Sequence, residues 1–248
     1  MRFWAVGVAA GVMLLLVVIE LLRRVRRSNR QLQTTNDQLQ QASESDPLTG
    51  LANRRHFRKL MQQEGDAGTR FTGALILIDL DHFKNINDDH GHAAGDAVLV
   101  EVACRLRMAL RDQDLAVRWG GEEFLVVLRA LPAERTGEVA ERMLQAIGGE
   151  PVAAGRAPIA VTASIGFASF PFDEQGRDLG WERAIDLVDQ AMYCAKAQGR
   201  NRACGVVRMS PAATVPGTGG PEALLGAWRG GEVELTQLVG PVPRGGWS

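Results

Sequence analysis

The chain has 248 residues, enough for one well-packed domain of about 150 to 180 residues with appendages, or for two small domains at most. Its 28 basic and 29 acidic residues leave a formal net charge of −1, so the overall charge gives no indication of a nucleic-acid partner. The three cysteines, Cys104, Cys194 and Cys204, have neither CxxC spacing nor an even number for disulfide pairing. A reducing compartment and packing roles are therefore expected for them.

The first 23 residues are predicted to form a single-pass membrane anchor. Residues 3–22 are apolar except for Glu20, and this length is sufficient to cross a bilayer as a helix. A cleaved signal peptide is the alternative, but the apolar stretch is longer than usual and the basic cluster follows it instead of preceding it. Five arginines between positions 23 and 30 predict an inner (cytoplasmic) membrane protein whose bulk lies in the cytoplasm.

Residues 24–45 are expected to continue this helix as a short signalling coiled coil. Apolar or small residues recur at spacings of three and four from Val18 to Ala42, which is typical of a parallel coiled coil. A polar linker helix without a partner is the alternative, because the seam has few large apolar side chains. Asp46-Pro47 should end the helix, since the residue before proline is disfavoured in the α region.

The apolar pattern between residues 46 and 207 predicts one globular domain of the α/β (α+β) class. Helices are expected around residues 51–61, 83–89, 95–110, 133–147 and 181–197. Strands are expected over residues 74–78, 114–119, 124–128, 159–170 and 202–207, the last at a sheet edge. Because strands alternate with helices while two strands form a hairpin, we expect a mixed central β-sheet with helices on both faces.

Glycines and acids cluster where that hairpin turns. Gly120 and Gly121 join the two strands, and glycine accepts the positive φ values of tight hairpin turns. Glu122 and Glu123 follow at once, so backbone N–H groups suited to phosphate would lie beside carboxylates suited to a divalent cation. A surface turn with solvated acids is the alternative for this pattern on its own.

A second acidic pair ends the buried strand at residues 74–78. An acid at this place, such as Asp79 or Asp81, is costly to bury unless a metal or a basic side chain pairs with it. As an isolated pattern, Asp-x-Asp is equally compatible with a cap or a turn.

Five motifs, read in order, resemble the GGDEF family of diguanylate cyclases. They are DPLTGLANRR at 46–55, DLDHFKNIND at 79–88, GHAAGD at 91–96, GGEEF at 120–124 and AKAQGRN at 195–201. The resemblance implies a palm-like nucleotide-cyclase domain over residues 46–207. It also implies an activity, the condensation of two GTP into cyclic di-GMP with release of two pyrophosphates by a homodimer of facing domains.

The resemblance assigns roles to the acids. Asp79, the Leu80 carbonyl and Glu122 would hold Mg²⁺ or Mn²⁺, since hard cations prefer oxygen ligands. Glu122 would also assist deprotonation of the attacking ribose 3′-hydroxyl. Glu123 would act as a second catalytic acid, either as a ligand or through a supporting hydrogen bond.

The resemblance also implies a GTP site. Asn87 and Asp96 would recognise guanine and select GTP over ATP; alone, they would be a helix-surface residue and a helix-terminal acid. A cyclase that accepts another purine remains an alternative at these two positions. The residues expected around the phosphates are Phe83, Lys84, Gly120, Gly121, Lys196 and Arg200.

Arg111 and Asp114 form an Arg-x-x-Asp at the family's spacing for a product-inhibition site. An ordinary ion pair at a helix end is the alternative. A catalytically silent cyclic di-GMP receptor would also use this site, but such a protein would be expected to have lost some of Asp79, Glu122, Glu123 and Lys196, and all four are present.

Residues 208–248 are rich in proline and glycine and lack a sustained period, so this tail is predicted to be mostly disordered. A short helix over residues 222–228 is compatible with its sequence.

Overall fold

The computed structural model describes residues 19–21, 23–24, 26, 44–66, 72–154, 157–171, 180–209 and 221–242. The chain separates into two units, Met1–Ser43 and Glu44–Ser248. The predicted anchor and coiled coil lie outside the described residues, apart from positions 19–21, 23–24, 26 and 44–45. Within the part of the chain that is described, no helix is both long and apolar enough to cross a membrane.

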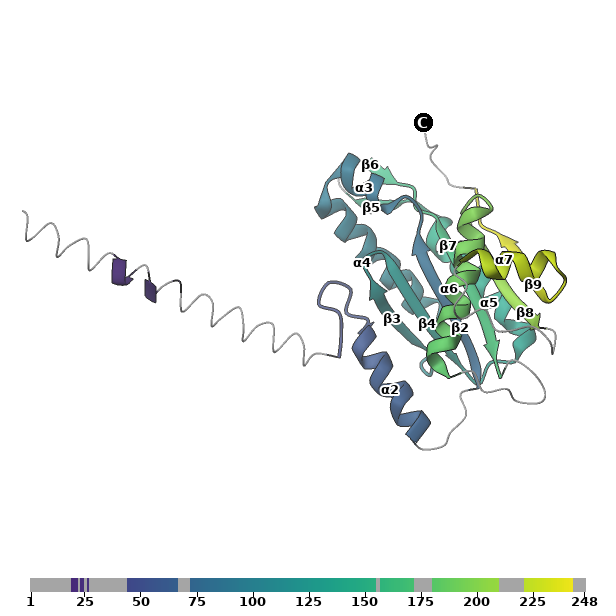
Figure 1. Cartoon of the computed structure of the whole chain (residues 1–248). Helices are drawn as coiled ribbons and strands as arrows, with labels where there is room; N and C mark the ends of the chain where they lie inside the picture. Colours follow the sequence, from purple (N-terminus) through teal and green to yellow (C-terminus); the bar gives the residue numbers. More distant parts are fainter. Residues whose placement is uncertain are drawn as a thin grey trace, which may run out of the picture. The chain divides into compact units, whose positions relative to one another are not determined.

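The second unit is built on a seven-stranded mixed sheet in the order β1-β3-β4-β2-β7-β8-β9 (Figure 1). Its strands are β1 (Ala52–Asn53), β2 (Gly73–Leu80), β3 (Leu115–Gly120), β4 (Glu123–Arg129), β7 (Ala163–Phe170), β8 (Arg202–Met209) and β9 (Val233–Val239). The pairs β1–β3 and β7–β8 are parallel and the other pairs antiparallel. The predicted mixed sheet is therefore confirmed.

Helices cover both faces of this sheet, as predicted. They are α2 (Arg54–Asp66), α3 (Phe83–His90), α4 (His92–Met108), the 3-10 turn η1 (Ala133–Arg135), α5 (Thr136–Gly148), α6 (Trp181–Ala197) and α7 (Pro221–Arg229) (Figure 1). The alternation of side chains along β2 assigns each face. Ile76 and Ile78 pack in the core with α4 and α5, whereas Leu75 and Leu77 pack in the core with α2 and α6.

Two glycines stand at places where a side chain would be strained or would clash. Gly91 has a φ of 84° and separates α3 from α4, a conformation that glycine adopts without strain. Gly166 marks a close approach, because a Cβ there would stand 1.9 Å from the Val188 carbonyl oxygen and 2.3 Å from the Met192 nitrogen of α6. No bulge occurs at Gly166, since its register with β2 is continuous.

The strands differ from the prediction in three ways. The strand expected over 159–170 is divided: β6 (Ala157–Ile159) pairs with β5 (Val152–Ala154) in a separate two-stranded sheet, and β7 begins at Ala163. A two-residue strand, β1, was not predicted, because such a short segment carries no periodicity. The strand expected at the sheet edge, β8, is internal, since β9 pairs with it along its whole length.

The prediction of a mostly disordered tail after residue 208 is wrong for residues 221–242. The short helix forms as α7, whose Leu224 is fully buried in the core beside α6. β9 pairs antiparallel with β8, from Val239 opposite Arg202 to Val233 opposite Met209. The physical reason is that β8 offers unpaired backbone groups at its outer edge, and a strand that pairs with them satisfies its own at the same time.

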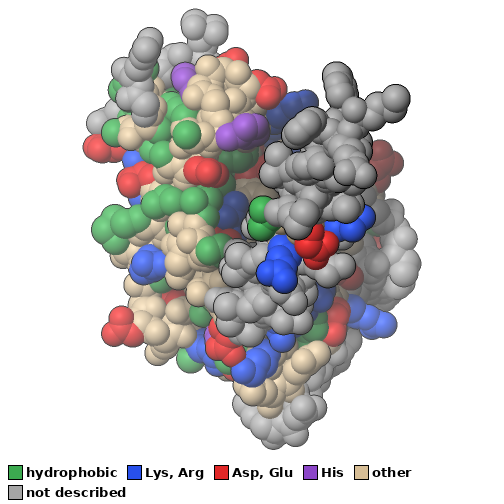
Figure 2. Space-filling model, turned by 90° about the vertical axis from the view of Figure 1, so that its left-hand side faces the viewer, with side chains coloured by type: hydrophobic (Ala, Val, Ile, Leu, Met, Phe, Trp, Pro, Cys, Tyr) green, Lys and Arg blue, Asp and Glu red, His purple; other side chains and the backbone are tan. Residues whose placement is uncertain are grey.

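The cysteines divide into two environments. Burial raises the pKa of the Cys194 thiol to about 11 and that of Cys204 to about 12, so both are neutral packing groups at physiological pH. Cys104 is exposed on α4, which corrects the prediction that all three are packing residues. In the face drawn in Figure 2, basic and acidic side chains are interspersed, as the near-zero net charge would suggest.

Candidate active site

The centre of the site is a pair of acids at the ends of two neighbouring strands. Asp79 on β2 and Glu123 on β4 are direct partners in the antiparallel ladder. Both follow the alternation that places Leu77 and Leu125 on the α6 side of the sheet. The sequence therefore brings two carboxylates together on one face, next to the C-terminal end of α6.

Lys196, in the last turn of α6, supplies the basic partner that a buried Asp79 requires. Its Nζ atom lies 2.8 Å from Asp79 Oδ2, and the side chains are 29% and 12% exposed. Burial raises the pKa of Asp79; Lys196 opposes this rise, whereas the charges of Glu122 and Asp81 add to it. The net direction is upward, because burial together with the two neighbouring acids outweighs the effect of Lys196.

The pKa of Glu123 is also raised. Burial raises its pKa, and the carboxylates of Asp79 and Asp189 raise it further, while Lys196 acts in the opposite direction. Asp189 lies on α6 and was not singled out in the sequence. Its own pKa is raised by burial, with Lys196 opposing. One lysine thus faces several half-buried carboxylates, an arrangement that a bound cation would stabilise.

The hairpin turn places Glu122 beside Asp79. Gly120 ends β3, Glu123 begins β4, and Gly121 and Glu122 form the turn between them. The Leu80 N–H donates to the Glu122 carbonyl at 3.3 Å, which fixes the turn against the end of β2. The predicted hairpin is confirmed.

The reason given for its glycines is wrong. Neither Gly120 nor Gly121 has positive φ. Both glycines border open space: a Cβ on Gly121 would meet nothing within 4 Å, and one on Gly120 would meet only Glu123 Oε2, at 3.3 Å. The backbone of the turn is thus open to a ligand.

Arg118 was missed in the sequence, although it connects two of the recognised motifs. Its Nη1 atom donates to both Asp46 carboxylate oxygens, at 3.1 and 3.2 Å. Its Nε and Nη2 atoms donate to the Gly121 carbonyl, at 3.2 and 3.0 Å. The planar guanidinium therefore fixes the hairpin turn to the first motif of the domain. No local signal identifies this contact, because its partners are far apart in the chain.

Asp46 is the structural centre of that first motif. Its Oδ1 accepts the Thr49 N–H at 2.8 Å and the Thr49 hydroxyl at 2.7 Å. Burial alone would raise the pKa of Asp46, but the Thr49 hydrogen bonds and Arg118 outweigh it, and the pKa is lowered. Asp46 is thus a charged anchor for Arg118 across the physiological range.

The donors suggested for a metal fit a divalent cation by their chemistry. Asp79, Glu122 and the Leu80 carbonyl are oxygen donors next to one another at the end of β2 and the hairpin turn, and hard cations prefer such ligands. No three His, Cys, Asp or Glu side chains form a metal-binding group within the described ranges. Two carboxylates and one carbonyl leave further coordination positions for phosphate oxygens.

Asp81, the second acid of the strand-end motif, lies in the surroundings of a structural residue and not in those of a metal ligand. Its side chain is 1% exposed. It accepts hydrogen bonds from the Thr162 hydroxyl at 2.8 Å, the Ser164 hydroxyl at 2.7 Å and the Asn201 N–H at 2.9 Å. Its carboxylate is therefore satisfied within the protein, and Asp79 alone of the pair faces Lys196.

The two residues expected to recognise guanine lie where α3 meets α4. Asn87 is half-buried on α3, and its Oδ1 lies 2.0 Å from the place where a Gly95 Cβ would stand. Asp96 follows Gly95 on α4 and is exposed. Because Gly95 has no side chain, Asn87 can approach α4 closely. The structure thus brings Asn87 next to the residue that precedes Asp96.

The start of α3 provides main-chain donors near the acids. α3 begins at Phe83, after His82 in the left-handed conformation with φ of 55°. The first N–H groups of a helix have no partner within it and suit anions. Lys84 is exposed, but the Phe83 side chain is only 7% exposed and belongs to the core. A phosphate contact from Phe83 is therefore restricted to its main chain.

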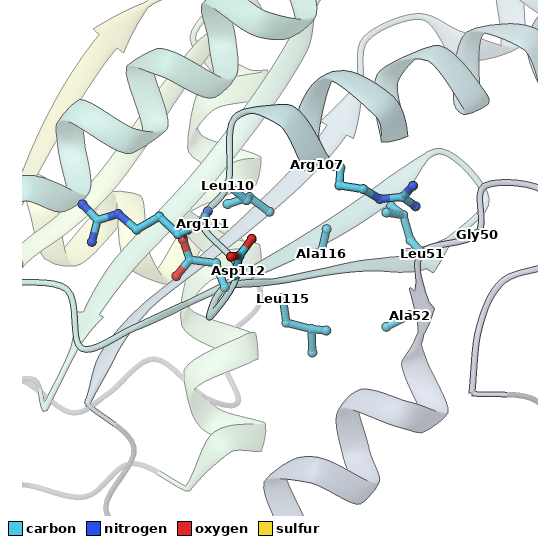
Figure 3. A pocket seen from close by; sticks show the side chains of 10 residues that line it. Gly50, Leu51, Ala52, Arg107, Leu110, Arg111, Asp112, Leu115 and Ala116 are labelled. Atoms are coloured by element: carbon cyan, nitrogen blue, oxygen red, sulfur yellow. Dashed lines mark hydrogen bonds between the residues drawn. The ribbon is translucent and has the colours of Figure 1, made fainter.

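The predicted product site lies away from these acids, at the junction of α4 and β3. Arg107, Arg111, Asp112 and Asp114 line a hollow of about 380 Å³ together with residues of the first motif. Arg107 and Arg111 extend on opposite sides of it (Figure 3). Asp114 accepts the Arg111 N–H at 3.1 Å and the Arg129 N–H at 3.2 Å. Among described residues the Arg111 guanidinium has no ion pair, so the simple Arg–Asp ion pair is not what forms.

Comparison with known proteins agrees with this arrangement. The family described as diguanylate cyclase, GGDEF domain, matches residues 43–202. Diguanylate cyclase DgcP of Pseudomonas aeruginosa is 43% identical over 168 residues, covering 67% of this chain and 24% of that protein. Diguanylate cyclase A of Treponema denticola is 38% identical over 172 residues, covering 67% of this chain and 45% of that protein. The chain thus spans less than half the length of these two relatives.

Solved structures show the same fold. Diguanylate cyclase SiaD of Pseudomonas aeruginosa, in complex with its activator SiaC, has a TM-score of 0.58 at 33% identity, covering 80% of this chain and 76% of that chain. The coiled coil and GGDEF domain of DgcB from Caulobacter crescentus, in complex with c-di-GMP, has a TM-score of 0.56 at 26% identity, covering 73% and 96%. By the family match and by the fold, this chain belongs to the GGDEF diguanylate cyclase family.

Proposed function

We propose that this chain is a diguanylate cyclase that condenses two GTP into cyclic di-GMP. The single observation that carries the proposal is the ion pair of Lys196 with Asp79 beside Glu122 and Glu123, where burial and neighbouring carboxylates raise the pKa of Asp79 and of Glu123 although Lys196 opposes both shifts. The relatives named as diguanylate cyclases support the same activity.

The reaction is a nucleotidyl transfer. The ribose 3′-hydroxyl of one GTP attacks the α-phosphorus of the other. A bond forms between the 3′-oxygen and this phosphorus, the bond between the phosphorus and the oxygen that bridges to the β-phosphate breaks, and pyrophosphate leaves. Two such transfers close the ring and release two pyrophosphates. When bound, Mg²⁺ or Mn²⁺ supplies positive charge that stabilises the transition state and lowers the pKa of the attacking hydroxyl.

The residues of the chain have distinct parts in this proposal. Asp79, Glu122 and the Leu80 carbonyl hold the cation, and Glu122 accepts the proton of the 3′-hydroxyl. Glu123 supports Asp79 from the neighbouring strand. The groups that surround the phosphates are the main chain of Phe83, Gly120 and Gly121 and the side chains of Lys84, Lys196 and Arg200.

Guanine selection is assigned to the place where α3 meets α4. The Asn87 amide can meet the acceptor edge of the base, and the Asp96 carboxylate can accept from its N1 and N2 hydrogens. Adenine offers the opposite pattern at these positions, so its binding would leave polar groups unpaired.

The test is to incubate the full chain with Mg²⁺ and either GTP or ATP, and to measure released pyrophosphate and the mass of the product. One pyrophosphate per GTP, cyclic di-GMP as the product and no turnover of ATP are expected. GDP with phosphate as the products, or equal use of ATP, would contradict the proposal. Binding of cyclic di-GMP without any turnover would favour the silent receptor.

We also propose that the enzyme acts as a homodimer. One GTP per domain and a two-fold symmetric product require two sites to face each other. Residues 24–45 would raise the effective concentration of domains, so the rate per domain should fall on dilution, more steeply for a chain that lacks residues 1–45. Equal specific activity of both chains across a wide dilution series would exclude a role for this segment.

Membrane anchoring through residues 3–22 is proposed from sequence alone. If the segment spans the bilayer, the full chain should remain in the membrane pellet after alkaline carbonate extraction, and a chain lacking residues 1–23 should not. Release of the full chain by carbonate would contradict an anchor.

A further inference from the structure

The turn between α6 and β8 has an unusual backbone. Arg200 and Asn201 have positive φ values of 61° and 45°, and two consecutive residues other than glycine in this region are uncommon. The turn directly follows the end of α6, which carries Lys196. A conformation of this kind persists only where surrounding contacts determine it.

On its inner side, the turn is fixed to the strand that carries Asp79. The Asn201 N–H donates to Asp81 Oδ2 at 2.9 Å. Asp81 is itself held by the hydroxyls of Thr162 and Ser164, and its own N–H donates to the Thr162 carbonyl at 2.9 Å. Hydrogen bonds to a buried carboxylate are among the stronger ones in proteins, so the inner contact is rigid.

On its outer side, the turn is held by the end of β9. The Gly240 N–H donates to the Asn201 carbonyl at 2.8 Å, and Asn201 Nδ2 donates to the Pro241 carbonyl at 2.8 Å. Asn201 thus accepts a hydrogen bond from Gly240 and donates one to Pro241, the two residues that follow β9. The contacts continue the pairing of β8 with β9, which ends at Arg202 and Val239.

Gly240 must lack a side chain for this contact to form. A Cβ on Gly240 would stand 2.1 Å from Asn201 Oδ1 and 3.0 Å from the Asn201 carbonyl oxygen, although its φ is not positive. Asn201 Oδ1 is buried and has no hydrogen-bond partner among the described residues. Glycine at position 240 is therefore required by the close approach of Asn201 and not by backbone conformation.

We propose that the C-terminal strand β9 is a positioning element for the active site, and that Asn201 and Gly240 are its positioning residues. Through them β9 holds the 198–201 turn, and with it Arg200 and the end of α6 that carries Lys196, in the arrangement that binds the triphosphate. The proposal rests on the function proposed above for Lys196 and Arg200. It assigns a role in GTP binding to a part of the chain after residue 207, beyond the matched family domain, which ends at residue 202.

The experiment uses three variants of the full chain and a matched control. Gly240→Ala forces Asn201 away. Asn201→Gly tolerates the positive φ but removes the side chain that bonds Pro241. The third variant combines both. The control is Gly226→Ala on α7, where a Cβ meets nothing within 4 Å and alanine favours the helix.

Three quantities are measured for each variant: KM and kcat for GTP, affinity for a non-hydrolysable GTP analogue by calorimetry, and the temperature of unfolding. We expect Gly240→Ala and Asn201→Gly each to raise KM and weaken analogue binding about tenfold, the effect of losing one charge-assisted contact. The double variant should bind the analogue no more weakly than the single variant with the lower affinity, because both changes break the same contact. Gly226→Ala should match wild type.

Three results would overturn the proposal. If Gly240→Ala matched Gly226→Ala, or if it lowered kcat with the folded fraction while KM and analogue affinity stayed at the wild-type value, β9 would have a structural role only. If the effects of the two single variants multiplied in the double variant, Gly240 would not act through Asn201. Should wild type bind the analogue but form no cyclic di-GMP, the proposed function would fail, and the binding series would still decide this inference.

Discussion

The Oδ2 atom of Asp79 and the Nζ atom of Lys196 lie 2.8 Å apart, joining the end of a central strand to the last turn of α6. Lys196 opposes the charges of the neighbouring acids, because Glu122 and Asp81 both act to raise the pKa of Asp79. Lys196 therefore opposes the rise in the pKa of Asp79 and favours its anionic form.

Replacement of Lys196 by methionine should weaken metal and GTP binding together. Without the ammonium group, burial and the neighbouring acids raise the pKa of Asp79 further, and a protonated carboxyl is a poor ligand. We expect the Mg²⁺ concentration at half-maximal rate to rise about tenfold or more. Lys59→Met is the control, since Lys59 is an exposed partner of Glu44 outside the site. An unchanged Mg²⁺ dependence would exclude this role of Lys196.

The raised pKa of Glu123 predicts that the stability of the folded chain falls as the pH rises. Burial, then Asp79 and Asp189, raise its pKa above the ordinary value of 4.5, so the folded state holds this proton more tightly than the unfolded chain. Its contribution to stability is complete below the unfolded pKa and is lost as pH rises through the folded pKa. In metal-free buffer, the unfolding temperature of Glu123→Gln should therefore rise relative to that of wild type as the pH increases above 4.5.

The measurement is thermal unfolding of both chains at several pH values, with Glu141→Gln, an exposed site on α5, as the control. A constant difference in unfolding temperature between wild type and Glu123→Gln at all these pH values would show that folding does not change the pKa of Glu123. Adding Mg²⁺ with a GTP analogue should reverse the trend for wild type, because ligand carboxylates must be deprotonated to bind the cation.

Periodicity was sufficient to predict the longer helices and most of the strands that pack in the core. The predicted helix 181–197 agrees with α6, and the run 74–78 lies inside β2, all eight residues of which are buried. The alternation that buries Leu75 and Leu77 beside α6 also places Asp79 there. Asp79 and the glycines and acids of the hairpin were therefore identifiable from the pattern of the sequence, whereas Lys196 was identified only through the resemblance to the GGDEF family, and Asp189 was missed.

Features that depend on contacts between distant segments were not predictable. The bonds from Arg118 to Asp46 and Gly121 join places with no common local pattern. β9 has the alternation of a strand only in part, and the prolines and glycines around it favoured disorder. Its formation depends on the open edge of β8 and on the hydrogen bonds that join Asn201 to Gly240 and Pro241, and no single window of the sequence contains all of these residues.

Arg111→Ala should relieve product inhibition without changing the initial rate. Arg111 lines a hollow at the junction of α4 and β3, apart from the acids, and its guanidinium can engage two acceptors of a bound nucleotide. Product bound there would favour a non-productive arrangement of domains. Progress curves with added cyclic di-GMP are expected to show at least about tenfold weaker inhibition in the variant. Equal inhibition in both would leave the Arg-x-x-Asp with a structural role only.

The formation of cyclic di-GMP by wild type and by Glu122→Gln, followed by mass spectrometry under identical GTP and Mg²⁺ conditions, tests the central claim most directly. Glutamine keeps the size of the side chain at the hairpin turn but can neither act as an anionic ligand nor accept the proton of the 3′-hydroxyl. We expect wild type to form the product, and Glu122→Gln to form it at least about a hundredfold more slowly with an unchanged temperature of unfolding. A wild-type rate in Glu122→Gln, or no cyclic dinucleotide from wild type with either Mg²⁺ or Mn²⁺, would contradict the account.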